Sequence, residues 1–312
     1  MTWVVWRQHR GEGLITLGVL ALIAVFLLIT GLNMAHSSQQ LGLTDCLAHA
    51  RDRSICGPLE EAFTNQYSYL LGIVPFLLVL PILFSALIGA PLVARELEQR
   101  THLLVWTQSI TRFRWLTVKL ALVLSAALLV FGVLLASLIW WEIPIVQFRG
   151  SFGGSFDFSG PVWLGAALLA LALGIFAGTL TRRVVFAIFL TIALFLAIRV
   201  PVELFWRPHF APALTVTWPV GQDTPPIMLS DQDWTLARGW IDAQGNKTNN
   251  LSCDGSQTFD QCLQTNGVRA NYLTYQPADR FWTFQWIETA IYLGFSLLAL
   301  GATVWLVRWR LT

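Results

Sequence analysis

The sequence has few charged residues for a soluble protein of its length. Only 12% of its 312 residues are Asp, Glu, Lys or Arg, while 55% are hydrophobic. Soluble domains carry about 25% charged residues. Such a chain cannot cover its surface with polar groups in water, and its formal net charge of +2 is too small to indicate a nucleic-acid-binding protein. The composition therefore predicts an integral membrane protein.

The sequence also lacks the short motifs of common catalytic sites. There is no GxxxxGK[ST] phosphate loop. The stretch 150–155 is glycine-rich, but it lacks the lysine of that motif. Neither an HExxH zinc motif nor a GxSxG nucleophile elbow is present. The five histidines are scattered, and the four cysteines show no CxxC spacing, so no metal site is predicted. The chain is not expected to hydrolyse ATP or to be an enzyme by itself.

Long apolar runs dominate the chain instead. Because a helix rises about 1.5 Å per residue, a hydrocarbon core of roughly 30 Å needs about 20 apolar residues. The first run is too long for the apolar region of a signal peptide, so we expect it to be retained. Six runs are long enough to predict transmembrane helices, at Leu14–Met34, Tyr69–Val93, Leu120–Trp141, Val162–Leu180, Val184–Phe205 and Phe284–Val307.

The distribution of Lys and Arg predicts the orientation of these helices. Short loops on the cytoplasmic side of a membrane are enriched in both residues. With the N-terminus inside, the basic segment between the second and third helices and the Arg182–Arg183 pair both face the cytoplasm. The inverted topology would place them outside. We therefore expect both termini to be cytoplasmic.

Two longer loops lie outside in this topology, at 35–66 and 206–283. The second mixes polar turns with aromatic segments, and we expect a small irregular extracellular cap with one or two short helices, more a lid than a binding domain. All four cysteines fall in these loops, on the oxidising side of a plasma membrane. Pairing within each loop is the local choice among three possible connectivities, and it would join Cys46 to Cys56 and Cys253 to Cys262.

A few ionisable residues fall within or near the predicted spans. Arg199 and Glu203 are four residues apart on the fifth span, hence on one helix face, while Glu142 and Glu288 lie near the outer ends of the third and sixth spans. Charges inside a membrane are costly and often mark a transport pathway. The alternative is a set of ion pairs that fixes helix packing. The GxxxG motif at 174–178 is compatible with a close helix contact and is weak grounds for placing a dimer there.

The segment 94–109 separates the second and third spans and is amphipathic. A helix at the membrane surface could bury its apolar members and present Arg95, Glu96, Glu98, Gln99, Arg100 and His102. Such a helix could rest on lipid without a partner. Two acidic residues argue against lipid alone, because anionic headgroups repel them.

This region resembles the coupling-helix region of type-2 ATP-binding-cassette (ABC) transporter permeases, and most closely an actinobacteria-like group. The similarity lies in Pro91-Leu-Val-Ala-Arg-Glu-Leu-Glu, Thr101, the stretch Trp106–Arg112, Arg114-Trp-Leu and Lys119. It extends over six spans in matching order, from about Leu14 to Arg310. Arg100 stands where the family has a small residue such as Gly.

The resemblance implies an all-α permease subunit of an ABC exporter in the bacterial plasma membrane. Two copies of a cytoplasmic ATPase would bind ATP and Mg²⁺, and the chain itself would bind no cofactor. A second permease, identical to the first, would complete the transporter. The substrate would be amphipathic, such as a lipid, drug or peptide-like molecule. The residues implied in ATPase docking are Arg95, Glu96, Glu98, Arg100 and Thr101.

Two other functions remain open at the level of sequence. A sensor or immunity protein would use the same fold, with the outer loops binding a ligand. A membrane-embedded lipid-modifying enzyme would use Arg199, Glu203 and Glu288 as its site, although no nucleophile or metal motif accompanies them.

Overall fold

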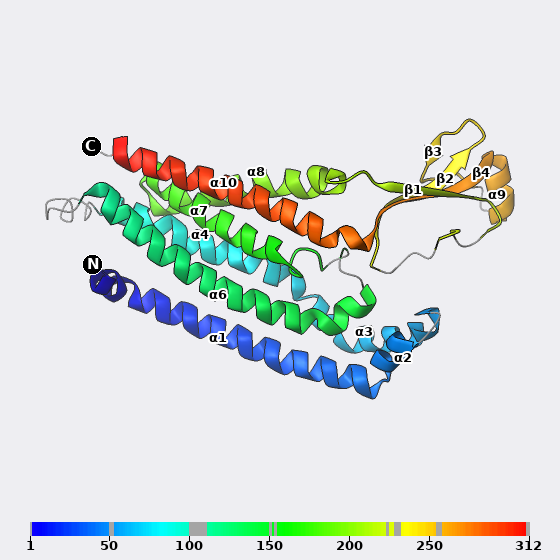
Figure 1. Ribbon diagram of the computed structural model, residues 1–312, viewed down its shortest axis with the longest axis horizontal. Coiled ribbons are helices and arrows are strands. Elements are labelled where there is room, and N and C mark those ends of the chain that lie inside the picture. Colours follow the sequence, from blue (N-terminus) through cyan, green and yellow to red (C-terminus); the bar gives the residue numbers. More distant parts are fainter. Residues whose placement is uncertain are drawn as a thin grey trace.

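The computed structural model describes residues 2–49, 53–99, 111–149, 152, 155–222, 225–227, 232–253 and 258–309. Long helices lie side by side, with a small sheet beyond one end of the bundle (Figure 1). The α-helices are α1 (Thr2–Gln40), α2 (Leu43–His49), α3 (Gly57–Leu71), α4 (Val74–Glu98), α6 (Arg112–Arg149), α7 (Pro161–Thr181), α8 (Val184–Pro201), α9 (Phe259–Thr265) and α10 (Phe281–Trp309). Single turns are η1 (Arg53–Cys56), η2 (Val202–Trp206), η3 (Arg207–His209) and η4 (Ala278–Arg280).

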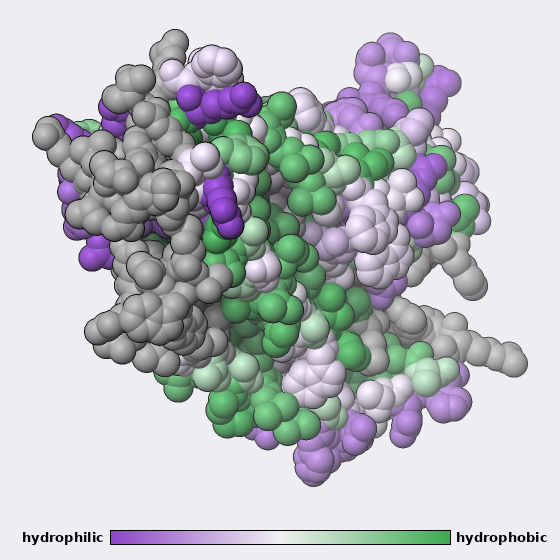
Figure 2. All heavy atoms as spheres, turned by 60° about the vertical axis from the view of Figure 1, so that its left-hand side comes forward, coloured by the Kyte–Doolittle hydropathy of each residue, from purple (hydrophilic) through white to green (hydrophobic). Residues whose placement is uncertain are grey.

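Five helical segments among the described residues are long and apolar enough to cross a membrane. They are Ala21–Gln40, Phe113–Val146, Pro161–Thr181, Val184–His209 and Ala278–Trp309. Apolar side chains cover a broad band of the surface, with hydrophilic side chains at its edges (Figure 2). The prediction of a mainly helical integral membrane protein is confirmed. The five segments overlap five of the six predicted spans. The remaining predicted span, Tyr69–Val93, overlaps α4, which is not among the five segments.

Helix α7 is the central element of the bundle. It packs against α4, α10 and α8, and it is buried along most of its length. Its close approach to α4 depends on glycine: a Cβ on Gly174 would lie 3.0 Å from the backbone nitrogen of Ala90, and one on Gly178 would overlap the Ala90 carbonyl oxygen. Small residues let membrane helices approach in this way. The GxxxG motif is thus used for packing inside the chain.

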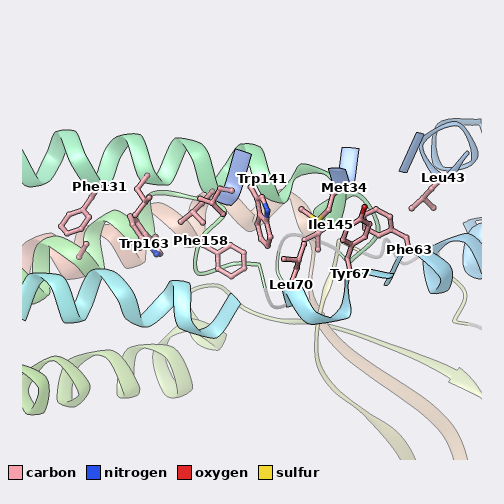
Figure 3. Close-up of a cluster of buried hydrophobic side chains, with 14 of the residues drawn as sticks. Met34, Leu43, Phe63, Tyr67, Leu70, Phe131, Trp141, Ile145, Phe158 and Trp163 are labelled. Carbon is pink, nitrogen blue, oxygen red and sulfur yellow. The ribbon is translucent and has the colours of Figure 1, made fainter. Parts of the chain in front are cut away.

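The C-terminal ends of α1 and α6 pack against helices α2 and α3. Trp141 Nε1 donates to Thr30 Oγ1 at 2.9 Å, which joins α6 to α1. Tyr67 Oη on α3 donates to the backbone oxygen of Asn33 at 3.0 Å. Figure 3 shows these aromatic side chains in one buried cluster that includes Met34 and Leu70. A disulfide between Cys46 and Cys56 joins α2 to η1.

The second outer loop is not the irregular cap that the sequence led us to expect. It forms an antiparallel sheet in the order β1-β4-β2-β3, from β1 (Leu214–Pro219), β2 (Trp234–Asp242), β3 (Lys247–Thr248) and β4 (Val268–Gln276). The strands contain the β-branched and aromatic residues that favour extended structure, as in Leu-Thr-Val-Thr-Trp and Tyr-Leu-Thr-Tyr. The prediction missed them because the frequent proline and glycine nearby indicated irregular loop.

Candidate functional site

We expected the segment 94–109 to form a separate coupling helix. In the structure, residues 94–98 of this segment are the end of α4. Helix α4 continues without a break through Glu98. No proline or glycine follows Pro91 within it, and Ala-Arg-Glu-Leu-Glu is a sequence of strong helix formers. Arg95, Glu96 and Glu98 therefore lie on the last turns of a long helix. Arg100 and Thr101 lie outside the described residues.

The structure places Glu96, one of the predicted docking residues, in the interior. Its carboxylate pairs with the Lys119 ammonium of α6, and the two side chains are 10% and 4% exposed. Lys119 Nζ also donates to the backbone oxygen of Leu92 at 3.4 Å and lies 4.9 Å from the ring centroid of Trp115. In the sequence, Lys119 was a basic residue near a span end and part of the family resemblance, and its pairing with Glu96 was not predicted.

Glu98 connects the end of α4 to the turn between α7 and α8. Its Oε2 accepts a hydrogen bond from the Val184 backbone N–H at 3.2 Å, which satisfies one free donor at the start of α8. Arg182 ends α7 in the left-handed conformation, with φ 57°. A surface groove at this end is lined by Glu98, Arg182, Arg183, Val185 and Phe186.

At the end of the bundle nearest the sheet, two arginines and two acidic residues form a largely buried cluster. Arg207 binds Glu288 with two hydrogen bonds, Nε to Oε2 at 2.7 Å and Nη2 to Oε1 at 2.8 Å. Asp157 Oδ1 lies 2.6 Å from Nη2 of Arg207 and 2.6 Å from Nη2 of Arg199. Tyr292 Oη donates to Glu288 Oε1 at 2.8 Å and accepts from Arg199 Nη1 at 3.0 Å. The cluster ties α8 and η3 to the loop before α7 and to α10.

Two of the residues singled out in the sequence, Arg199 and Glu288, belong to this cluster, and Glu203 lies at its edge. Arg199 Nη1 lies 3.4 Å from Glu288 Oε1, and Arg199 Nε lies 3.4 Å from Oε2 of the partly exposed Glu203. Neither Asp157 nor Arg207 was predicted as a member. Asp157 follows the glycine-rich stretch 150–155, which carried no signal for a buried contact. Arg207 follows the π-helical turn η2, whose extra residues per turn no sequence period indicated.

The charges of this cluster are balanced by one another. Burial raises the pKa of Asp157, but the guanidinium groups of Arg199 and Arg207 outweigh burial, and the pKa is lowered overall. Glu288 is fully buried and accepts from Arg207, Arg199 and Tyr292. Such mutual saturation is typical of a structural ion network. Within the described part of the chain, no group of three or more His, Cys, Asp or Glu is placed to hold a metal ion.

Glu142 lies near the outer end of α6, apart from the arginines. Its side chain is buried, and its Oε2 accepts from Ser159 Oγ at 2.5 Å. Its Oε1 has no hydrogen-bond partner among the described residues. Glu142 is thus a buried carboxyl group held by serine hydroxyls.

The structure joins the cysteines within each outer loop. Cys46 is bonded to Cys56, and Cys253 is bonded to Cys262. The second bond connects the segment after β3 to α9, beside the sheet. Helices α2 and α9, which carry one cysteine of each disulfide, lie toward the end of the bundle where α8 ends and α10 begins (Figure 1).

Comparison with known proteins gives one match. Residues 17–207 match the family described as "ABC-2 membrane transporter related", which is more than half of the chain. The match includes the end of α4, the start of α6 and the arginines of α8 and η3, and it stops before the sheet. No curated protein and no solved structure matches the chain. The chain belongs to the ABC-2 membrane transporter related family.

Proposed function

We propose that the protein is the permease subunit of an ABC exporter driven by ATP hydrolysis in a separate ATPase subunit. The family match carries this proposal, because an ABC-2 permease implies association with an ABC ATPase. The absence of a phosphate loop from the sequence agrees with an ATPase encoded separately. The permease would supply the membrane pathway, and the ATPase would supply ATP and Mg²⁺.

In this proposal, the ATPase docks at the end of the bundle where α4 ends and α6 begins. Arg95, Glu98 and Gln99 are exposed at the end of α4, and Arg114 is exposed at the start of α6. The Arg182–Arg183 turn contacts Glu98 through the first residue of α8. Mixed charges of this kind suit a protein surface better than an anionic lipid surface. Arg100 and Thr101 extend the same docking segment.

The membrane topology that we propose has six spans, with α4 as the second. Its 25 residues extend over about 37 Å, which is enough for a hydrocarbon core of roughly 30 Å. Phe76, Leu83 and Leu87 of α4 are exposed, as lipid-facing side chains would be. The basic residues at the docking end support a topology with both termini in the cytoplasm of a bacterial cell.

Two identical permeases and two ATPases form the transporter in this proposal. The substrate is amphipathic, a lipid, a drug or a peptide-like molecule, because a pathway between apolar helices favours such compounds. Exposed apolar side chains on α1 and α8, such as Leu22 and Phe189, offer surfaces to a second permease or to lipid.

Co-purification with the ABC ATPase of the same organism tests this function. We expect the ATPase to remain bound to the wild-type permease and to be lost from Glu98→Lys, which reverses an exposed charge at the docking end. Glu98→Gln removes the charge but keeps a side-chain oxygen that can accept from the Val184 N–H. It therefore tests the effect of the charge apart from that of the hydrogen bond at the start of α8. Asp260→Lys, an exposed charge reversal on α9, is the matched control. If the wild-type permease binds no ABC ATPase, or if Glu98→Lys binds it as well as the control does, the docking proposal is wrong.

A further inference from the structure

The Glu96–Lys119 ion pair lies where two helices flank the docking segment. Glu96 is on the last turns of α4, and Lys119 is on the first turns of α6. Both side chains are nearly inaccessible, and Lys119 is fixed further by the Leu92 carbonyl oxygen and the Trp115 ring. A buried pair with such additional contacts is costly to break by removing one partner, because the other charge stays in the interior.

The surroundings of the pair are apolar. A buried cluster at this end joins α4, α6, α7 and α10 through Leu92, Val93, Leu97, Trp115, Leu116, Leu120, Leu171, Ile175 and Val307. Because the two side chains have little contact with solvent, the attraction between their charges is stronger than at the surface.

The pair connects two helices that share α7 as a neighbour but differ in their other main neighbour. Along their lengths, α4 packs chiefly on α7 and α8, whereas α6 packs chiefly on α1 and α7. The apolar cluster brings the two helix ends together, and the ion pair adds a directional link between them. The long Lys119 side chain reaches across to both Glu96 and the Leu92 carbonyl, and so it joins the two groups of helices.

We propose that the Glu96–Lys119 pair ties the ends of α4 and α6 so that both helices move as one body when the ATPase acts on the segment between them. This inference rests on the proposed function. It makes Glu96 a positioning residue that acts through Lys119 and not a docking residue that the ATPase touches. Without the pair, displacement of the segment would separate the helix ends instead of moving both groups of helices.

Spin labels on the two helices test the tie in the permease–ATPase complex. Ile88→Cys and Leu122→Cys place labels at exposed positions on α4 and α6, outside the docking surface. The four native cysteines are disulfide-bonded and do not compete for the label. The distance distribution is recorded by electron paramagnetic resonance without nucleotide and after trapping with ATP and vanadate. We expect the wild-type distance to be the same in both states.

Lys119→Met and Glu96→Gln break the ion pair in this labelled background. We expect each variant to show the wild-type distance without nucleotide and a longer, broader distribution after trapping, with the amount of bound ATPase unchanged. The charge swap Glu96→Lys with Lys119→Glu should restore one narrow distribution. Asp260→Asn, on the outer face, is a control that should match the wild type.

The outcomes separate this inference from the proposed function. Single variants that keep the wild-type distance after trapping would overturn the tie. A longer distance already present without nucleotide, together with a lower thermal stability, would also overturn it, because the pair would then serve packing alone. Failure of the ATPase to bind even the wild-type permease would contradict the proposed function instead.

Discussion

Helices α7 and α8 are consecutive apolar helices, but different interactions hold them in the molecule: close packing holds α7, and charged contacts anchor α8. The apolar window of α7 is 83% buried, and that of α8 is 17% buried. Helix α7 is rich in alanine and glycine and is packed tightly on α4 through Gly174 and Gly178. Helix α8 exposes Val185, Phe186 and Phe189 and is anchored by charge, with Glu98 at its start and the arginine cluster at its outer end.

The difference shows that hydrophobicity alone does not tell which membrane helix is central. In lipid, large apolar side chains are stable at the surface, and a buried helix is marked by small residues that permit close contact. One helix is therefore held by shape and the other by ion pairs. Variants that remove each kind of contact can test this contrast.

The largest expected effect is the loss of the arginine that anchors α8. Arg207→Met leaves Glu288 and Asp157 without a principal partner, and removing one member of a buried ion pair costs about 3–5 kcal/mol. We expect a large fall in the temperature at which the detergent-solubilised protein loses monodispersity. Glu203→Gln, whose side chain is 39% exposed, should cause little change. An equal fall in thermal stability in the two variants would show that burial does not determine how much an ion pair contributes to stability here.

A bulky residue at the α4–α7 contact should have the next largest effect. Gly178→Leu forces a side chain against the backbone of Ala90, and overpacking costs about 1–3 kcal/mol, or more where backbone must move. Gly132→Leu on α6 is the matched control, since a Cβ there meets nothing within 4 Å. The yield of folded protein and its thermal stability are the measurements. A Gly178→Leu variant as stable as Gly132→Leu would refute the role of shape in holding α7.

Acid should weaken the anchor of α8 through Asp157. The pKa of Asp157 in the folded protein is lowered below 3.8 by the two guanidiniums, despite burial, which opposes this shift. The resulting stabilisation is present above the unfolded pKa and is lost as pH falls through the folded pKa. Thermal stability should therefore hold from neutral pH to about 4 and fall below it. Asp157→Asn should be less stable at neutral pH and should lack this part of the acid dependence.

The smallest expected effect lies on the exposed face of α8. Phe189→Ala removes a side chain that is 67% exposed, and surface substitutions usually change stability by about 0.5 kcal/mol or less. Thermal stability measured in detergent should stay close to that of the wild type. A large loss would show that another chain covers this face, and it would favour α8 as the contact between two permeases.

Much of the helical architecture was predictable because membrane spans carry their signal locally. Twenty or so apolar residues in a row define a span wherever they occur, so α7 and α10 were located within a few residues of their observed ends. Local pattern did not reveal which helix is central. Gly174 and Gly178 indicated a close contact, but only the fold shows that the contact is with α4.

The charged contacts were harder to predict, because they join residues distant in sequence. Arg199 and Glu203 are four residues apart, and their proximity follows from the helix period. Asp157 and Arg207 are separated by 50 positions, and Lys119 and Glu96 by 23, so no local period relates them. The sheet was missed for a different reason: the segments between its strands are rich in proline and glycine, which indicated an irregular loop although β2 and β4 have nine residues each.

The side chain of Gln285 has a consequence for how the chain assembles as it is made. Its Oε1 accepts from the Val162 N–H at 3.1 Å, and its Nε2 donates to the Phe156 carbonyl at 2.6 Å. The first turn of α7 thus obtains a hydrogen bond from α10, which is synthesised 123 residues later. At 5–20 residues per second, α7 waits roughly 6–25 s for this partner. The centre of the bundle is therefore completed only after the last span has entered the membrane.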